Sequence, residues 1–204
     1  MNYKVCILAA GKGSRMGSLT NNLNKALLPI NFKAAISYVI EKHPISVEII
    51  VAVNYKSEEI IEYLGCAYPS RKIKYVYVDE IGKQGSGPGY SILCCKKYLQ
   101  TPFIVSTVDT LIKEDCPLPK NNWMGIDNVQ DTQSYCSVLI DDNTGLIKEI
   151  KDKQICNNKF AFIGLAGVKD FELFFSTLER DKTQINKELQ LSNGFKGLIN
   201  LGLH

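Results

Sequence analysis

The sequence is poor in the residues that build metal sites and membrane spans. It has only two histidines, His43 and His204, and its seven cysteines form neither a CxxC pair nor a zinc-type Cys/His spacing. No apolar stretch approaches the roughly 18 residues that a transmembrane helix needs. The N-terminal residues lead straight into an apolar run, so we expect no signal peptide. These absences favour a cytoplasmic protein with reduced, mostly buried thiols and no membrane partner.

Excess charge of one sign is also lacking. The net charge of +3 is too small to indicate a nucleic-acid partner, although it is compatible with a local anion site. The chain has 204 residues, of which 45% are hydrophobic and 22% charged, as is usual for a globular protein with one sizeable core. We see no internal repeat or low-complexity linker, and therefore expect one domain over residues 1–204.

In the first half, apolar runs alternate with helical patterns, as βαβ units require. Runs rich in Val and Ile, typical of strands covered on both faces, lie at 4–9, 47–53, 73–78 and 103–108. Helices are predicted at 34–42, 57–64 and 88–99. Ser57 is the expected cap of the second helix, and Pro88 suits the first turn of the third. His43 is expected near a helix end.

The second half has shorter elements. Strands are predicted at 123–128, 134–140, 147–150 and 161–168, with a hairpin turn at 141–145, followed by helices at 171–178 and 183–191. The fold class is therefore α/β, with a doubly wound, mixed but mostly parallel sheet. Ligands in such sheets bind beyond the C-terminal ends of the strands.

A glycine-rich loop follows the first predicted strand. The run ends in Ala10-Gly11-Lys12-Gly13-Ser14-Arg15, and Lys25 lies ten positions beyond Arg15. Glycines let backbone N–H groups face phosphates, Arg offers a planar fork of donors, and Lys adds a mobile charge. The loop is not a Walker A loop, because Gly13 is followed by Ser14-Arg15, nor a GxGxxG fingerprint, because Met16 replaces the last glycine. The layout predicts a polyphosphate site.

The strings LAAGKGSRM (residues 8–16) and NKALLPI (residues 24–30) resemble the signature LAAGxGTRL and PKxLLPI of the sugar-1-phosphate nucleotidylyltransferases. The resemblance implies a nucleotide-diphospho-sugar transferase fold with an NTP-binding half at 1–112 and an acceptor-binding half at 113–204. It implies an NTP and a phosphorylated small molecule as substrates, and catalytic roles for Arg15 and Lys25. The nucleotide-binding residues that it implies in this loop are Leu8, Ala9, Ala10, Gly11, Lys12, Gly13 and Ser14.

A single carboxylate, Asp109, follows the predicted strand at 103–108. A carboxylate at a strand end can project into the ligand crevice and hold Mg²⁺ together with substrate phosphates. In the resembled family an Asp at this place binds the metal, so the resemblance implies Mg²⁺ as the cofactor and Asp109 as its ligand.

A second glycine-rich loop lies at 79–90. It resembles the family's QxxxxGTAGA, whose backbone contacts the base, which implies nucleotide contacts by Gly85 and Ser86. Asp79 or Glu80 stands where the family often has Gln. A carboxylate only accepts hydrogen bonds, so an acidic residue facing the base would suit guanine or cytosine better than thymine or uracil.

The segment GLIKEIKDK (145–153) resembles the family's GxVxxIxEKP, in which the Lys binds the acceptor phosphate. The match implies acceptor contacts by Asp152 and Lys153; Gln154 replaces the Pro, and Lys151 could substitute for Lys153. The strand at 162–165 resembles the family strand that places a glycine, here Gly164, beside the acceptor.

The chain departs from the family in two places. It lacks the WxDxGT string that carries a second metal-binding Asp in that family. Three explanations are open: the Asp lies in a segment beyond 204, the metal is held by Asp109 and phosphates alone, or the chain binds nucleotide without turnover; we favour the first. Asn24 replaces the Pro before Lys25, which we expect to affect mainly loop rigidity.

Three alternatives stay open. One is a cytidylyltransferase acting on a small phosphorylated alcohol or phosphonate. Another is a molybdopterin guanylyltransferase, although these have a shorter Arg-to-Lys gap. The third is a regulatory domain that binds nucleotide without catalysis.

Overall fold

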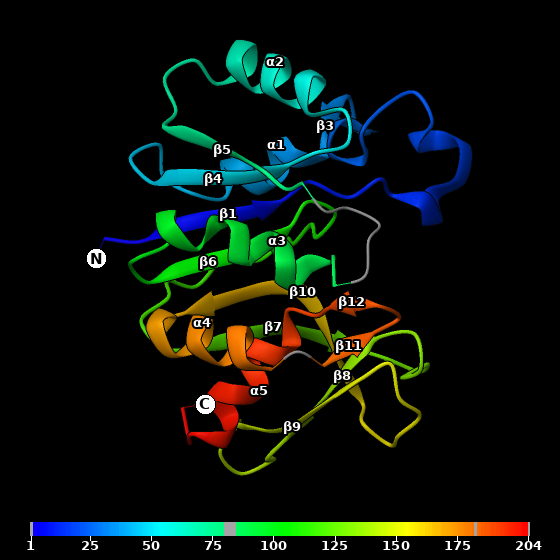
Figure 1. Cartoon of the computed structure of the whole chain (residues 1–204), viewed down its shortest axis with the longest axis vertical. Coiled ribbons are helices and arrows are strands. Elements are labelled where there is room, and N and C mark those ends of the chain that lie inside the picture. The colour runs from blue at the N-terminus through cyan, green and yellow to red at the C-terminus, as the bar shows by residue number, and fades with distance from the viewer. Residues whose placement is uncertain (1, 80–84, 182, 204) are drawn as a thin grey trace.

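The computed structural model describes residues 2–79, 85–181 and 183–203. Its centre is an eight-stranded sheet in the order β5-β4-β1-β6-β10-β8-β9, with β7 paired to β10 (Figure 1). The strands are β1 (Lys4–Leu8), β4 (Glu48–Val53), β5 (Ile73–Tyr77), β6 (Phe103–Thr107), β7 (Trp123–Asn128), β8 (Cys136–Ile140), β9 (Ile147–Asp152) and β10 (Phe160–Val168). Two short hairpins lie outside it: β2 (Pro29–Ile30) with β3 (Lys33–Ala34), and β11 (Gln184–Ile185) with β12 (Glu188–Leu189).

The sheet is mixed in the predicted way. β5, β4, β1 and β6 are parallel neighbours, whereas β10 runs antiparallel to β6, and β8 and β9 continue antiparallel. All eight strands predicted from the sequence are present, with bounds shifted by at most two residues. The turn at 141–145 joins β8 to β9, and Gly145 there has φ 71°.

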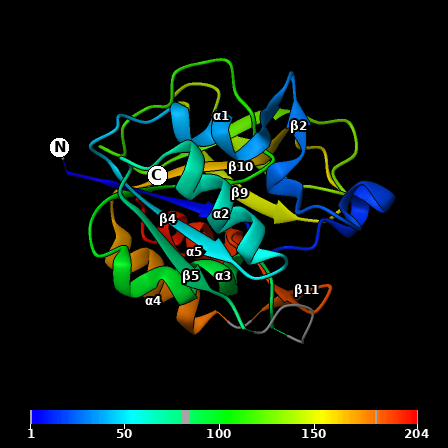
Figure 2. The same ribbon diagram turned by 90° about the horizontal axis from the view of Figure 1, so that it is seen from above.

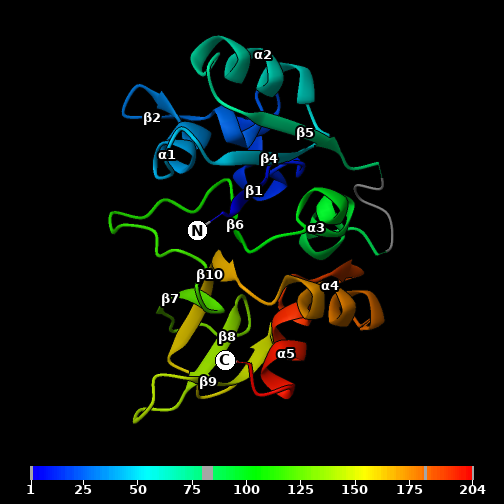
Figure 3. The ribbon, with the colours of Figure 1, turned by 90° about the vertical axis from the view of Figure 1, so that its left-hand side faces the viewer.

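Helices cover both faces of the sheet. α1 (Ala35–Glu41) and α2 (Ser57–Ala67) lie on one face, and α3 (Pro88–Cys95), α4 (Phe171–Arg180) and α5 (Ser192–Asn200) lie on the other (Figures 2 and 3). Alternate side chains of β1 enter the two layers: Val5 and Ile7 pack under α1 and α2, whereas Cys6 and Leu8 pack under α3. The continuous apolar runs therefore reflect burial on both faces.

The two predicted functional halves share one of these cores. Phe174 and Phe175 of α4 contact the ring of Phe103 on β6, with centroids 5.8 and 5.6 Å apart, and Phe195 of α5 contacts Phe174. All four phenylalanines are buried. Residues from beyond position 170 thus complete the core over strands of the first half.

The prediction of a helix at 183–191 is wrong. That segment forms the β11–β12 hairpin, whose turn residues Asn186 and Lys187 have φ 54° and 66°. The helix comes next, as α5, and was missed because it contains Gly194 and Gly197, which have low helix propensity. Packing explains both glycines. A Cβ at Gly194 would lie 2.4 Å from the ring of Phe174, and a Cβ at Gly197 would lie 2.3 Å from Thr177.

Three smaller expectations also changed. Lys56, not Ser57, is the residue before α2, and it has φ 51° with no side-chain cap bond. α3 ends at Cys95, and a 3₁₀ turn at Lys96–Tyr98 replaces its last predicted turn. All seven cysteines are free as expected, but only Cys6 and Cys95 are buried. Among the described residues, no helix combines the length and hydropathy needed to cross a bilayer.

His43 is a buried histidine just beyond the C-terminal end of α1, 6% exposed, with its ring 6.5 Å from that of Tyr3. Burial, together with the charge of Arg71, lowers the pKa of His43 to about 4. A histidine in the unfolded chain has a pKa near 6.5. Between these values the unfolded state binds more protons than the folded one, so stability rises with pH across this window.

We therefore expect His43 to make the protein less stable by roughly 3 kcal/mol at pH 4 than at pH 7, since one pKa unit corresponds to about 1.4 kcal/mol. The measurement is urea unfolding at several pH values, for the wild type and for His43→Gln, which does not titrate. The wild type should lose more stability than the variant as pH falls from 6.5 to 4. Parallel pH profiles for the two proteins would contradict this role of His43.

Candidate active site

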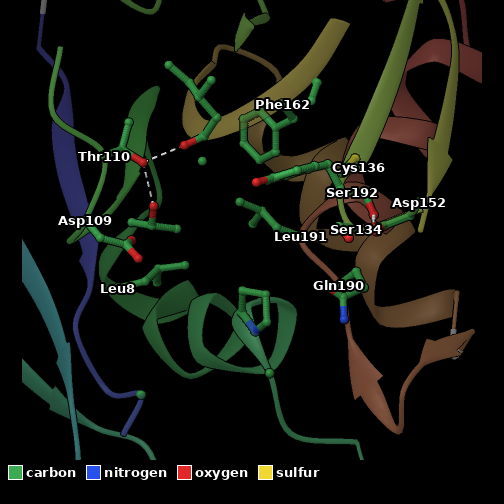
Figure 4. Close-up of a pocket in the computed structure, with 18 of the residues that line it drawn as sticks. Leu8, Asp109, Thr110, Ser134, Cys136, Asp152, Phe162, Gln190, Leu191 and Ser192 are labelled. Carbon is green, nitrogen blue, oxygen red and sulfur yellow. Dashed lines mark hydrogen bonds between the residues drawn. The ribbon is translucent and has the colours of Figure 1, made fainter. Parts of the chain in front are cut away.

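A cavity of about 1070 Å³ opens at the C-terminal ends of β1 and β6 and extends to β8, β9 and β10. In Figure 4, Asp109 lies on one side of it and Asp152 on the opposite side, with Phe162 and Leu191 between them. The predicted site residues that line it are Leu8, Ala10, Gly11, Lys12, Gly13, Ser14, Arg15, Lys25, Ser86, Asp109, Asp152, Lys153 and Gly164. The structure therefore brings residues from separate sequence segments, spread over positions 8 to 164, to one cavity.

The first glycine-rich loop owes its shape to Gly13. This residue has φ 68° and precedes a 3₁₀ segment (Ser14–Thr20), and the Thr20 hydroxyl donates to its carbonyl oxygen at 3.2 Å. A Cβ at Gly13 would lie 3.2 Å from Cβ of Lys25. The glycine is needed both for its left-handed backbone and for the close approach of the Lys25 stem.

Lys25 and Asp109 form an ion pair in the cavity lining. The Lys25 ammonium donates to Oδ2 of Asp109 at 3.0 Å, and the Lys25 side chain is 17% exposed while that of Asp109 is 54% exposed. Partial burial raises the pKa of Asp109, but the charge and hydrogen bond of Lys25 outweigh it and hold that pKa below its usual range. Asp109 is thus an ionised carboxylate facing the cavity.

Asn24 does more than replace a proline. It is fully buried, its Oδ1 accepts from the backbone N–H of Ala26 at 2.8 Å, and its Nδ2 donates to the carbonyl oxygens of Tyr55 (2.6 Å) and Ala9 (3.5 Å). These bonds cap the 3₁₀ turn Lys25–Leu27 and fix the backbone of Lys25. The preference of Asn for N-cap positions was the signal in the sequence that could have predicted this.

The second glycine-rich loop is bonded to the β11–β12 hairpin. The N–H of Gly85 donates to the Lys187 carbonyl, and that of Leu189 donates to the Ser86 carbonyl, both at 2.7 Å. Ser86 lines the cavity, whereas Gly85 does not. Asp79 is exposed after β5 and is not among the cavity-lining residues, and Glu80 lies outside the described residues. Ala9 is fully buried behind the first loop, with its N–H bonded to Ala52.

The side of the cavity opposite Asp109 is built around a buried carboxylate. Asp152 is 4% exposed and accepts a hydrogen bond from Oγ of Ser192 at 2.6 Å. Next to it, Lys153 has φ 53°, and its N–H donates to the Tyr135 carbonyl. The ammonium of Lys151 pairs with Glu149 at 3.1 Å instead of lining the cavity.

Gly164, on β10, lies on the side of the cavity formed by Thr107, Asp109 and Thr110. It has φ 88°, and a Cβ there would lie 2.4 Å from Oγ1 of Thr107. Thr110 shares a hydrogen bond with Thr107 and donates to the Ile163 carbonyl (Figure 4). Gln190, Leu191 and Ser192 also line the cavity. The sequence did not predict this, because it indicated a helix at 183–191 in place of the β11–β12 hairpin.

Residues 5–116, which include the first loop, Lys25 and Asp109, match the MobA-like NTP transferase domain. The chain is 32% identical over 197 residues to the bifunctional protein GlmU of Methanocaldococcus jannaschii, covering 95% of this chain and 46% of that protein. It is 31% identical over 143 residues to D-glycero-alpha-D-manno-heptose 1-phosphate guanylyltransferase of Campylobacter jejuni, covering 67% of this chain and 62% of that protein. The chain spans about half the length of its GlmU relatives.

Solved structures share the fold. A UDP-glucose pyrophosphorylase complexed with UDP-glucose superposes with a TM-score of 0.80 at 21% identity, over 98% of this chain and 88% of that one. The CTP:phosphocholine cytidylyltransferase of Streptococcus pneumoniae superposes with a TM-score of 0.74 at 21% identity, over 98% and 85%. The predicted fold class is thereby confirmed. Because the domain match covers more than half of its residues, this chain belongs to the family of MobA-like NTP transferase domains.

Proposed function

We propose that this chain is a nucleotidylyltransferase that transfers NMP from an NTP to a sugar 1-phosphate and releases pyrophosphate. The observation that supports this most directly is one cavity with a glycine-rich loop, Arg15 and Lys25 at one end and Asp152 and Lys153 at the other. Such a cavity can hold a polyphosphate and a phosphorylated acceptor together. The named activity of the Campylobacter jejuni relative, a sugar 1-phosphate guanylyltransferase, agrees with this assignment.

In the proposed reaction, an oxygen of the acceptor phosphate attacks the α-phosphorus of the NTP. A new P–O bond forms as the bond to the bridging oxygen breaks, and pyrophosphate leaves with the electron pair. No protein nucleophile is needed, so catalysis consists of positioning and charge neutralisation. Arg15 and the backbone of residues 11–14 would hold the β- and γ-phosphates, and Lys25 would contact the α-phosphate.

The remaining residues would orient the two substrates. Ser86, which lines the cavity, would contact the base through its backbone, and Gly85, which does not line it, would hold Ser86 in place through its bond to Lys187. Lys153 would bind the acceptor phosphate, and Asp152 and Gly164 would border the sugar. Asp152 is buried and fixed by Ser192, so it can accept a hydrogen bond from a hydroxyl group in a defined direction.

The donors around Asp109 fit a magnesium ion held jointly with the nucleotide. Among the described residues no group of three or more His, Cys, Asp or Glu could hold a metal by itself. Mg²⁺ commonly uses one or two carboxylates and takes its other ligands from substrate phosphates and water. Asp109 is ionised, half-exposed and adjacent to the first glycine-rich loop (residues 10–17, called the phosphate loop from here on), so it would be the protein ligand. When bound, Mg²⁺ would supply charge neutralisation between the phosphates.

Thermal shift with ATP, GTP, CTP, UTP and dTTP, each with and without Mg²⁺, tests the nucleotide site. Binding to the native state raises the melting temperature by mass action, by an amount that grows with ligand concentration over Kd. We expect one NTP to stabilise the chain and Mg²⁺ to increase its effect. Stabilisation by none of them would contradict the proposed site.

Pyrophosphate release then tests the reaction. The selected NTP is combined with glucose 1-phosphate, N-acetylglucosamine 1-phosphate, phosphocholine or 2-aminoethylphosphonate. Release only with a sugar 1-phosphate is the expected result. Release only with the last two would favour the cytidylyltransferase alternative, and binding without release by any acceptor would favour a regulatory domain.

A further inference from the structure

Tyr55 contacts the phosphate loop from outside the cavity. It lies between β4 and α2, is half-buried, and is not among the residues that line the cavity. Its polar groups nevertheless all bond to the segment 10–24. Its N–H donates to the Ala10 carbonyl at 3.3 Å, and its carbonyl accepts from Nδ2 of Asn24 at 2.6 Å. Its hydroxyl donates to the carbonyls of Thr20 (3.0 Å) and Asn21 (3.2 Å).

These contacts fall at three structurally distinct points of the loop. Ala10 is where the chain leaves the first strand, Thr20 and Asn21 are where the 3₁₀ segment ends, and Asn24 precedes Lys25. Thr20 extends the network, because its hydroxyl donates to the carbonyls of Gly13 (3.2 Å) and Gly17 (3.3 Å). One residue therefore holds the start of the loop, its end, and the anchor of the catalytic lysine.

A glycine-rich loop needs such support. Gly11, Gly13 and Gly17 give this segment many accessible backbone conformations, and a ligand that had to order them would bind more weakly. Asn24 and Thr20 are buried, so the bonds that connect them to Tyr55 are partly shielded from competing water, whereas the bond from the Tyr55 hydroxyl to Asn21 is exposed. The loop is thereby pre-organised before any phosphate arrives.

We propose that Tyr55 is a positioning residue of the phosphate site, which orders residues 10–25 through its hydroxyl and backbone without touching substrate. The inference rests on the proposed function only in taking the ligand of this loop to be a polyphosphate. It is specific to the phosphate end, because no bond of Tyr55 given by the structure leads to the acceptor end.

Tyr55→Phe tests the proposal because it deletes only the hydroxyl. Tyr38→Phe is the matched control: the Tyr38 hydroxyl also donates to a backbone carbonyl, that of Ile30 at 2.7 Å, but at the β2–β3 hairpin away from the cavity. Calorimetric titration measures the Kd of the phosphate site directly, with inorganic tripolyphosphate and with the NTP that the thermal-shift experiment selects as ligands. We expect Tyr55→Phe to weaken both ligands roughly five- to tenfold, the effect of one or two hydrogen bonds, and Tyr38→Phe to change them less than about twofold.

Two further readouts separate positioning from general stability. In Tyr55→Phe the KM for the NTP should rise while the KM for the acceptor stays unchanged, and amide exchange should speed up at residues 11–23 but not in β4. Thr20→Val, which removes the second layer of the network, should act in the same direction. Equal binding by wild type and Tyr55→Phe, or equal losses in both tyrosine variants, would overturn the role of Tyr55 alone. A wild type that binds neither tripolyphosphate nor any NTP would overturn the proposed function as well.

Discussion

Lys25→Ala is expected to lower turnover by on the order of a hundredfold or more, the usual effect of removing one preorganised contact to a transition state. The buried Asn24 fixes the turn that carries Lys25, and the Cβ and Cδ atoms of Lys25 pack close to Gly13, so the position of its ammonium does not depend on a flexible stem alone. Negative charge that develops on the α-phosphate would lose its nearest cation. Arg15→Ala should give a loss of similar size through the β- and γ-phosphates. Initial rates of pyrophosphate release at saturating substrates measure both.

These variants should lose turnover without losing much folding stability. The Lys25–Asp109 pair is partly exposed, and such ion pairs contribute little to folding, so the melting temperature should change little. Loss of Lys25 would remove the charge and the hydrogen bond that outweigh the effect of partial burial, so the pKa of Asp109 should rise. Lys33→Ala is the matched control, since it also breaks an ion pair, with Glu41 at 2.5 Å, away from the cavity. Turnover near the wild-type level in Lys25→Ala would show that Lys25 only pairs with Asp109 and has no role in catalysis.

Asp109→Asn is expected to abolish magnesium-dependent turnover. Asparagine keeps the size of the side chain but removes the negative charge that a hard divalent cation requires. The melting temperature gives a second readout: the extra stabilisation that Mg²⁺ adds to NTP binding should disappear, while stabilisation by the NTP alone should remain. The remaining stabilisation would show that the phosphate loop is intact.

The control for Asp109→Asn is Asp127→Asn. Asp127 is also an exposed carboxylate that lines the cavity, but it lies near the C-terminal end of β7, within the predicted acceptor-binding half. We expect Asp127→Asn to keep the magnesium effect. If Asp127→Asn removed the effect and Asp109→Asn did not, the metal would be held at the acceptor end instead.

The strands and the phosphate loop were predictable because their signals are local. Val5 to Ala9 is a continuous apolar run, and the glycines after it follow from backbone geometry. Asp109 could be placed because parallel strands end at one edge of the sheet. These features need only short-range pattern and topology.

Other features depend on partners far away in the sequence, and local patterns could not reveal them. Positions 194 and 197 of α5 are glycines because two side chains of α4 leave no space for a Cβ. Asp152 is oriented by Ser192, forty positions later, and Tyr55 by groups thirty or more positions earlier. Such contacts override intrinsic propensity.

The β11–β12 hairpin has a consequence for synthesis of the protein. The main chain of Gly85 and Ser86 is bonded to residues roughly a hundred positions later (Figure 1), and a Cβ at Gly89 would lie 2.8 Å from the Gln190 carbonyl. Closing such a long segment is slow compared with local folding. A nascent chain that has exposed only its first half contains both glycine-rich loops but lacks the β11–β12 hairpin to which the second loop is bonded. If the proposed nucleotide site is correct, nucleotide cannot guide early folding through both loops, and recognition of the base is expected only after the hairpin has emerged from the ribosome.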